Sequence, residues 1–297
     1  MMILVTGGTG FVGRALARQL VANGESVRIL LRPSPLSPNL PRGVSVEVVV
    51  CSLSDERGLQ AAMKGVNVVY HLAGSERRGT RADLLGVDVN GARTLARAAM
   101  QAGVERVIYL SHLGADRFSA YPVLKAKAIA ENYLMHSGVG YTIFRSAIIY
   151  GENDQFSTMF ARLLKLSPGL FLLPGGGNTL LQPIWVEDLV TCMIYALDDA
   201  ETVGQIISVG GTEYFSFRQI IEILMEVTAT RRRLVSIQPA YLRMITLLIE
   251  QFIPRFPVSI FWLDYLAADR TTALDSVPRL FGLMPARFQH HLGYLRS

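Results

Sequence analysis

MILVTGGTGFVG, residues 2–13, joins a short apolar run to three glycines that stand three residues apart, and RALARQLVANG follows at residues 14–24. The apolar run predicts a buried strand, and the second segment, with apolar residues at helical spacing and a glycine at its end, predicts a helix. Gly7, Gly10 and Gly13 allow a tight turn, the approach of a pyrophosphate to main-chain N–H groups, and close packing of the helix on the strand. The stretch therefore predicts a dinucleotide-binding strand, turn and helix.

Strands and helices continue to alternate after this unit. The alternation implies right-handed crossovers and a parallel sheet with helices on both faces. Such a sheet binds its ligand at the carboxyl ends of the strands, which here means near the glycine turn. We predict strands over 26–32, 44–50, 66–74, 104–114 and 204–211, and helices over 56–65, 89–103 and 184–199.

This pattern divides the chain into two domains. A Rossmann domain, a doubly wound parallel α/β sheet, is expected over 1–212 with an insertion near 152–182. A small, mostly helical C-terminal cap or substrate domain is expected over 213–297, where residues 216–229 have the pattern of an amphipathic helix with Ser216 as its cap.

The composition is that of a folded globular protein: of 297 residues, 50% are hydrophobic and 18% charged, with a net charge of +5. The basic residues are spread along the chain, with a single run at 231–233, and no basic patch is interleaved with aromatic residues. We therefore expect no nucleic-acid partner. Cys51 and Cys192 stand far apart without clustered histidines, which argues against a metal site or a disulfide and fits a reducing cytoplasm. The N-terminus runs straight into a strand, so no secretion signal is expected.

The stretch at 241–267 is the most apolar long segment, but it is interrupted too often to form the roughly 20 apolar residues of a membrane span. Burial in the cap or self-association is one interpretation. A membrane-surface contact or a lipid or quinone site is the other, since flanking arginines and a mean hydropathy of +0.31 suit an interface. The interruptions are Arg243, Glu250, Pro254, Arg255 and Pro257.

The end of the second strand bears on the choice of dinucleotide. An acidic residue there would accept hydrogen bonds from the ribose hydroxyls of NAD, whereas this chain has Arg32, whose guanidinium suits a 2′-phosphate. NADP is therefore favoured, with NAD as the second choice. The alternative is that Arg32 merely opens the proline-rich loop at 32–43.

Several motifs together resemble the extended or atypical short-chain dehydrogenases/reductases. They are TGGTGFVG (6–13), HLAG (71–74), Asn90 in VDVNGARTL, and YTIFRSAIIYG (141–151). YLSHLGA (109–115), SAIIYGENDQF (146–156) and LQPIWVEDLV (181–190) are similar to the Rossmann-fold accessory subunit of respiratory complex I and its bacterial relatives, an epimerase/dehydratase-like group.

The resemblance implies NAD(P) contacts at matching positions. Where relatives usually have Asp-Leu near the adenine, Ser52 replaces the aspartate, so a hydrogen bond to the adenine amino group is weakened or lost. The implied contacts are Gly7, Gly10, Phe11, Val12 and Gly13 at the pyrophosphate, Arg32 at the ribose, Ser52 and Leu53 at the adenine, and Ala73 and Gly74 at the inner ribose.

SAYPVLKAKAIAE, residues 119–131, contains a Tyr-x-x-x-Lys pair, Tyr121 and Lys125, the spacing that active family members use for proton transfer. A residue before proline is pushed toward extended geometry, and proline suits the first helical position, so Pro122 predicts that Tyr121 precedes the helix. The helix stop at Ser137–Gly138 favours a second register, with Lys127 as the family lysine and Val123 in the tyrosine position.

The resemblance places Ser111 in the first serine position of the fifth strand and aligns the usual catalytic hydroxyl with Leu113. Two of three catalytic groups are then replaced, and Lys127 is left to hold a ribose hydroxyl. His112, Tyr121 or Tyr150 could still act, although packing or exposure explains them as well, and His71 is expected to be a core histidine.

Two functions remain open, so we do not assign an enzyme activity from the sequence. The first is an NADP(H)-binding, atypical short-chain dehydrogenase-like protein whose dinucleotide serves structure, sensing or assembly beside a protein complex or membrane. The alternative is an active oxidoreductase or epimerase/dehydratase with a non-standard proton donor, acting on a hydrophobic or nucleotide-sugar substrate. A cytoplasmic location, with peripheral contact to a membrane, suits both.

Overall fold

The computed structural model describes residues 1–35, 37–252 and 259–296. Pro254, Arg255 and Pro257, which interrupt the predicted apolar stretch, lie outside the described residues. No described helix is long and apolar enough to cross a bilayer. The chain forms two compact units, one of Met1–Glu76, Asp83–Ser146 and Leu189–Ser208, the other of Arg77–Ala82, Ala147–Asp188 and Val209–Ser297.

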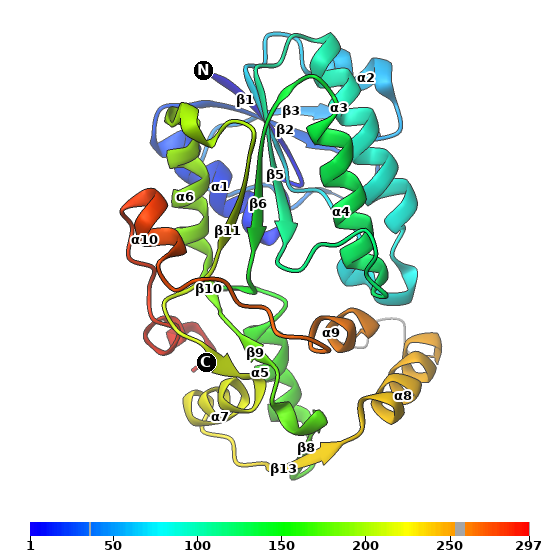
Figure 1. Ribbon diagram of the computed structural model, residues 1–297, viewed down its shortest axis with the longest axis vertical. Helices are drawn as coiled ribbons and strands as arrows, with labels where there is room; N and C mark the ends of the chain where they lie inside the picture. The colour runs from blue at the N-terminus through cyan, green and yellow to red at the C-terminus, as the bar shows by residue number, and fades with distance from the viewer. Residues whose placement is uncertain (36, 253–258, 297) are drawn as a thin grey trace. The chain divides into compact units, whose positions relative to one another are not determined.

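A seven-stranded sheet organises the first unit, in the order β11-β6-β5-β4-β1-β2-β3 (Figure 1). Neighbouring strands run parallel, and Ile3 in β1 pairs with Val27 on one side and Val68 on the other. The predicted doubly wound sheet is confirmed, and its order reverses between β1 and β4, where such sheets bind ligands. The strands are β1 (Met2–Thr6), β2 (Ser26–Leu31), β3 (Glu47–Val50), β4 (Val68–His71), β5 (Arg106–His112), β6 (Gly140–Ser146) and β11 (Gln205–Val209).

Helices cover both faces of this sheet, as predicted (Figure 1). α1 and α6 lie on one face, and α2, α3 and α4 on the other, where Leu95, Tyr109 and Leu134 share one apolar core. Cys51 and Cys192 are free thiols, both buried. The helices are α1 (Phe11–Ala22), α2 (Glu56–Ala62), α3 (Gly91–Gln101), α4 (Pro122–Met135) and α6 (Val186–Asp198), with short turns η2 (Leu84–Asn90) and η4 (Ala200–Thr202). The turn η1 (Glu76–Arg81) begins at the last residue of the Met1–Glu76 segment of the first unit and continues in the second unit.

The start of α4 confirms the prediction made from Pro122. Tyr121 is the N-cap residue, with extended backbone angles of φ −91° and ψ 117°, and Pro122 occupies the first helical turn. The helix ends at Met135, and Gly138 follows with a φ of +83°. Tyr121 therefore stands outside the helix, whereas Val123 and Lys127 lie within it and are buried.

Within its described residues, the second unit combines helices with three two-stranded sheets around an aromatic core. Phe160 packs against Phe156, Phe217 and Trp262 at ring-centroid distances of 5.1–5.7 Å. Ser216 caps α7 with a reciprocal capping box to Gln219, which confirms the predicted cap. The pairs are β7 (Ile149–Tyr150) with β10 (Ile184–Trp185), β8 (Leu170–Pro174) with β13 (Arg233–Ile237), and β9 (Leu180–Leu181) with β12 (Phe215–Ser216). The helices are α5 (Ser157–Leu166), α7 (Phe217–Val227), α8 (Pro239–Phe252), α9 (Ile260–Tyr265) and α10 (Ser276–Phe281), with turns η3 (Gly175–Gly177), η5 (Phe288–His291) and η6 (Gly293–Leu295).

Candidate functional site

The glycine turn between β1 and α1 has no room for side chains at two positions. Gly7 has a φ of +74°, and a Cβ on it would lie 2.8 Å from the backbone nitrogen of Ala73. A Cβ on Gly13 would lie 2.3 Å from the carbonyl oxygen of Gly7. The turn closes through a hydrogen bond from the Gly10 N–H to the Gly7 oxygen, 2.9 Å long. The glycines therefore bring helix, turn and the end of β4 into direct backbone contact.

The N-terminus of α1 is suited to an anion. Its N-cap residue is Gly10, so no side chain accepts from the first turn, and no acidic residue lies there. The N–H groups of Phe11, Val12 and Gly13 belong to this first turn, whose donors lack intrahelical acceptors and carry the positive end of the helix dipole. This cradle fits a pyrophosphate.

Three further predicted contacts lie at the carboxyl ends of β2 and β3, on the same edge of the sheet as the turn. Arg32 is exposed directly after β2. Ser52 follows β3, and its hydroxyl lies 2.8 Å from that of Ser54. Leu53 packs so closely on α3 that a Cβ on Gly91 would lie 3.2 Å from its Cδ1.

The end of β4 carries a buried histidine and the loop to Ala73 and Gly74. Thr6 Oγ1 and His71 Nδ1 are 2.7 Å apart, and the Ala73 N–H donates to Thr6 Oγ1 at 3.4 Å. Burial lowers the pKa of His71 to about 3, and the positive charge of Lys127 adds to this effect. His71 is thus a neutral core residue at physiological pH, as the sequence predicted.

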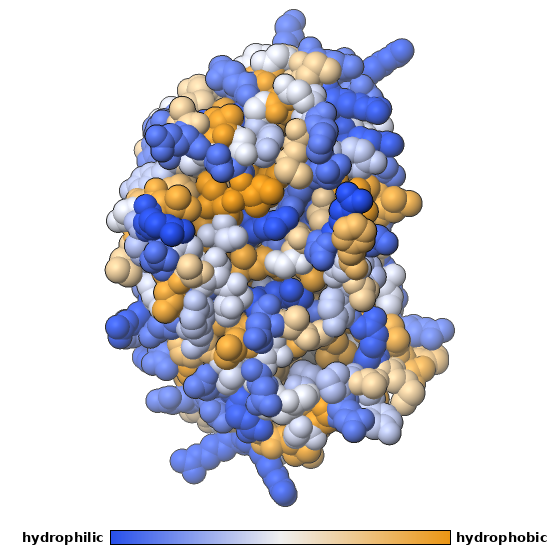
Figure 2. All heavy atoms as spheres, in the orientation of Figure 1, coloured by the Kyte–Doolittle hydropathy of each residue, from blue (hydrophilic) through white to orange (hydrophobic). Residues whose placement is uncertain are grey.

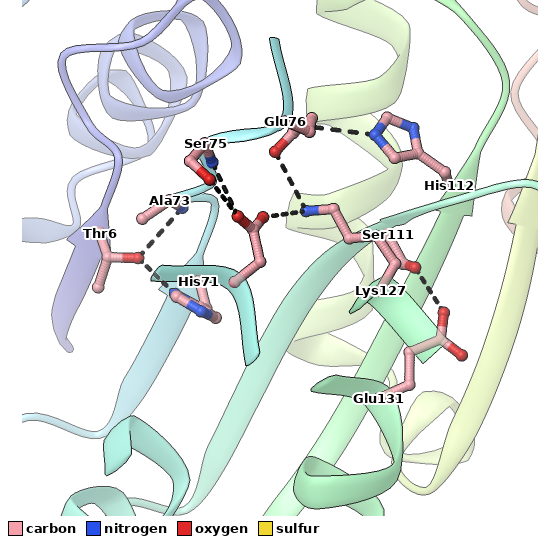
Figure 3. Close-up of polar contacts among 10 residues, drawn as sticks. Thr6, His71, Ala73, Ser75, Glu76, Ser111, His112, Lys127 and Glu131 are labelled. Carbon is pink, nitrogen blue, oxygen red and sulfur yellow. Dashed lines mark hydrogen bonds and ion pairs between the residues drawn. The ribbon is translucent and has the colours of Figure 1, made fainter. Parts of the chain in front are cut away.

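Lys127 projects from α4 into a cluster of carboxylates (Figure 3). Its Nζ lies 3.6 Å from Asp88 Oδ1 and 3.8 Å from Glu76 Oε2. Asp88 Oδ2 also accepts from the Ser75 N–H at 3.0 Å and the Ser75 hydroxyl at 2.6 Å. The side chains of Lys127 and Asp88 are 5% and 1% exposed, so this ion pair is largely shielded from water. Lys127 Nζ also lies 5.3 Å from the centre of the Tyr109 ring.

The pKa values in this cluster are set by burial and by the neighbouring charges. Burial alone would lower the pKa of Lys127, but Glu76, Tyr109 and Asp88 together hold it above its ordinary value. Burial raises the pKa of Asp88 to about 6, the charge of Glu76 adds to the rise, and Lys127 opposes it. Lys127 is therefore a permanent cation, and Asp88 takes up a proton in weak acid.

Ser111 points away from this cluster, toward Glu131 (Figure 3). Its hydroxyl donates to Glu131 Oε1 at 2.5 Å. Arg145 donates to the same carboxylate, from Nε to Oε1 at 3.1 Å and from Nη2 to Oε2 at 2.5 Å. Glu131 is 1% exposed, so the serine proton is used inside a buried network joining β5, α4 and β6.

Other predicted candidates have different surroundings. His112 Nε2 lies 3.7 Å from Glu76 Oε1, at the edge of the lysine cluster. Tyr150 belongs to the second unit, where its ring packs against Trp185 and Phe288. Burial, with Asp188 and Glu213 adding their charge, raises the pKa of Tyr150. The structure places His112 beside Lys127 and places Tyr150 in an aromatic core.

Sequence reasoning missed Glu76 and Asp88. A signal existed for both: Glu76 comes two residues after the HLAG motif, and Asp88 comes two residues before Asn90 in VDVNGARTL. HLAG was assigned to the dinucleotide site and VDVNGARTL was one of the motifs that carry the family resemblance, so carboxylates next to them were candidates for the same site.

A parallel sheet that has a glycine turn at its switch point, and a buried lysine, Lys127, on α4, defines a Rossmann-type NAD(P)-binding protein. Residues 7–162 match the family model described as NAD(P)H-binding, and the chain belongs to this family. It is 32% identical over 229 residues to NADH dehydrogenase (ubiquinone) 1 alpha subcomplex subunit 9, mitochondrial, of Arabidopsis thaliana, covering 75% of this chain. The match spans 57% of that plant protein's length.

Two other comparisons extend this relationship. The chain is 30% identical to Sterol demethylase protein B of Methylococcus capsulatus over 280 residues, which is 86% of this chain and 83% of that protein. The UDP-glucose 4-epimerase of Thermus thermophilus, solved as a complex with NAD, superimposes with a TM-score of 0.75 at 22% identity, covering 100% of this chain and 98% of that one. The structural likeness shows a shared fold.

Proposed function

We propose that the chain binds NADP(H) and that the dinucleotide serves structure, redox sensing or assembly instead of standard hydride transfer. A bound dinucleotide supplies a nicotinamide ring that gives or accepts a hydride. The cradle at α1 fits its pyrophosphate, and Lys127 is the residue we expect to hold a ribose hydroxyl. The other residues that would hold it are Gly7, Gly10, Phe11, Val12, Gly13, Arg32, Ser52, Leu53, Ala73 and Gly74.

The observation that carries this proposal is the state of the three groups that standard chemistry needs. Tyr121 precedes α4 instead of lying one turn before Lys127. Ser111 donates its single hydroxyl proton to Glu131. Lys127 faces two carboxylates, so its charge is already compensated. The tyrosine is therefore displaced and the serine proton is engaged, while Lys127 keeps the position from which we expect it to hold a ribose hydroxyl.

Tyr121→Phe tests the proposal directly. We expect the purified protein to contain a nucleotide that resists exchange, and we expect the variant to hold it with unchanged affinity because Tyr121 lies outside the helix. The measurement is identification of the co-purified nucleotide, followed by absorbance at 340 nm with candidate acceptors. A turnover present in the natural chain and lost in Tyr121→Phe contradicts the proposal.

Arg32→Ala tests the choice of NADP over NAD. Losing a charge-assisted hydrogen bond costs about 1.5–3 kcal/mol, so the Kd for NADPH should rise roughly ten- to a hundredfold while the Kd for NADH stays within about twofold. Calorimetric titration of both nucleotides measures this. Arg42→Ala, also exposed in the same loop, is the matched control. An equal loss for both nucleotides refutes the assignment.

A second candidate is an active oxidoreductase, or an epimerase/dehydratase, with a non-standard proton donor. It is favoured by His112, whose Nε2 is 3.7 Å from Glu76 in the cluster around Lys127. The similarity to Sterol demethylase protein B points to a hydrophobic substrate for such an enzyme. Turnover of an apolar carbonyl compound that survives Tyr121→Phe would support this candidate over the first.

We place the protein in the cytoplasm, with peripheral contact to a membrane or to a protein complex. Similarity to a mitochondrial NADH dehydrogenase subunit supports a role beside such a complex. The partners we infer are therefore the dinucleotide and either a hydrophobic small molecule or a protein assembly.

A further inference from the structure

The helix α8 buries polar residues and exposes apolar ones, which is the reverse of an ordinary surface helix. Its buried residues are Thr246 and Glu250, which are polar. Its most exposed large side chains are apolar or aromatic: Tyr241, Met244, Leu248 and Phe252, exposed between 52% and 78%. A helix in contact with water alone usually turns its apolar stripe inward, so this outward face calls for an apolar environment.

Hydrogen bonds within the second unit fix this orientation. The carboxylate of Glu250 accepts from the Thr80 N–H at 3.0 Å and from the Ile260 N–H at 2.6 Å. On the preceding turns of the helix, Arg243 pairs with Asp264 of α9. Rolling α8 inward would break these bonds and leave the Glu250 carboxylate without its buried donors. The apolar face is therefore held outward by polar contacts on the opposite side.

The exposed residues form a continuous stripe. Tyr241, Ile245, Leu248 and Phe252 follow the spacing i, i+4, i+7 and i+11 of one helix face. Tan and orange spheres gather over α8 in Figure 2. An open hollow of about 420 Å³ runs along the helix itself, lined by Ala240, Arg243, Met244, Leu247, Leu248 and Gln251. A helix of 14 residues is about 21 Å long, too short to cross a bilayer but suited to lying in its surface.

The exposed charged residues in the chain segment that leads into and forms this helix are all basic. From 228 to 252 the chain contains four arginines, Arg231, Arg232, Arg233 and Arg243, and a single acid, Glu250, which is buried. Arg233 is the first residue of β13, the strand that leads into α8, and Arg231 precedes that strand; both are exposed. Exposed arginines in the segment that leads into an apolar helix face attract anionic lipid headgroups.

We propose that α8 lies in the plane of an anionic lipid surface, with Tyr241, Met244, Ile245, Leu248 and Phe252 in the acyl boundary and Arg231 and Arg233 at the headgroups. This inference deepens the peripheral membrane contact in the proposed function and rests on it, although it requires neither a bound dinucleotide nor turnover. It gives the protein a lipid-contact surface within the second unit.

Flotation of the full chain with vesicles tests it. With equal parts phosphatidylcholine and phosphatidylglycerol, we expect binding that weakens as salt rises, and clearly weaker binding to phosphatidylcholine alone. Phe252→Ser combined with Leu248→Ser should reduce the partition coefficient at least about tenfold. Arg231→Ala with Arg233→Ala should reduce binding to the anionic vesicles and leave binding to the neutral ones unchanged.

The matched control replaces equally exposed apolar residues elsewhere. Phe118 is 80% exposed and Leu280 is 49% exposed, against 78% and 52% for Phe252 and Leu248. Phe118→Ser with Leu280→Ser should bind vesicles like the natural chain, and thermal melting checks that every variant is folded. The proposal is overturned if the natural chain stays unbound on anionic vesicles, or if the control loses as much binding as the α8 variant. A lipid-free dimer that dissociates on the α8 substitutions would assign the face to a second copy and equally overturn it.

Discussion

Lys127→Met should lower the free energy of unfolding by about 3–5 kcal/mol, because it removes the cation from a buried ion pair and leaves carboxylates behind. Asp88 and Glu76 would then face each other in a site that is largely closed to water. Urea denaturation at neutral pH, followed by tryptophan fluorescence, measures the loss. The same variant should also lose dinucleotide affinity if Lys127 holds a ribose hydroxyl.

The neighbouring lysine on α4 provides the control for this change. Lys125 is exposed, so Lys125→Met should shift the unfolding free energy by no more than about 0.5 kcal/mol. Adding Asp88→Asn to Lys127→Met should recover part of the loss, since it removes one of the uncompensated charges. A cost below about 1 kcal/mol for Lys127→Met would show that the pair is solvated and that the cluster is not buried as described.

Asp88→Asn should become progressively more stable relative to the natural chain as the pH rises from 4 to 7. The pKa of Asp88 is about 6 in the folded protein, against an ordinary value of about 3.9, so the folded chain holds this proton more tightly than the unfolded one. Stability from this group is therefore complete below about pH 4 and is lost as the pH rises through 6. A difference of two pKa units corresponds to about 3 kcal/mol of stability. The natural chain loses this stability as the pH rises, whereas Asp88→Asn keeps it because an amide has no proton to lose.

His71 acts in the opposite direction and makes the comparison with a variant necessary. Its pKa is lowered to about 3, so its contribution is present above about pH 6.5 and is lost as the pH falls. The natural chain shows the sum of both effects, whereas the difference between it and Asp88→Asn isolates the aspartate. Asp83→Asn, at the exposed cap of the same loop, accounts for general effects of replacing a carboxyl by an amide. A difference that does not change between pH 4 and pH 7 rules out the raised pKa.

The backbone of the site was largely predictable from local sequence. Gly7 and Gly13 stand where a Cβ would collide with main-chain atoms, and that requirement is visible as glycine spacing. Pro122 determined where α4 begins, because its effects on its own backbone and on that of Tyr121 act over one peptide bond. Such constraints are local, so a single sequence reveals them.

The side-chain contacts of the site were not predictable in the same way. Glu76, Asp88 and Lys127 come from three segments, and their meeting depends on how the loop after β4 and the turn η2 fold against α4. The partner of Ser111 was missed for the same reason, since Glu131 lies 20 residues away on another element. The sequence suggested which residue types lie near the cofactor. It did not show which charged side chains form ion pairs or which partner accepts the Ser111 proton.

The buried cysteines have a practical consequence for fluorescence work. Cys51 is 6% exposed and Cys192 is fully buried, and burial raises the pKa of the Cys51 thiol, which keeps it protonated and slow to alkylate at neutral pH. Maleimide dyes should therefore leave the folded chain almost unlabelled. Phe252→Cys would introduce one readily labelled thiol on the outward face of α8, where quenching by brominated acyl chains would report how deeply that face enters a bilayer.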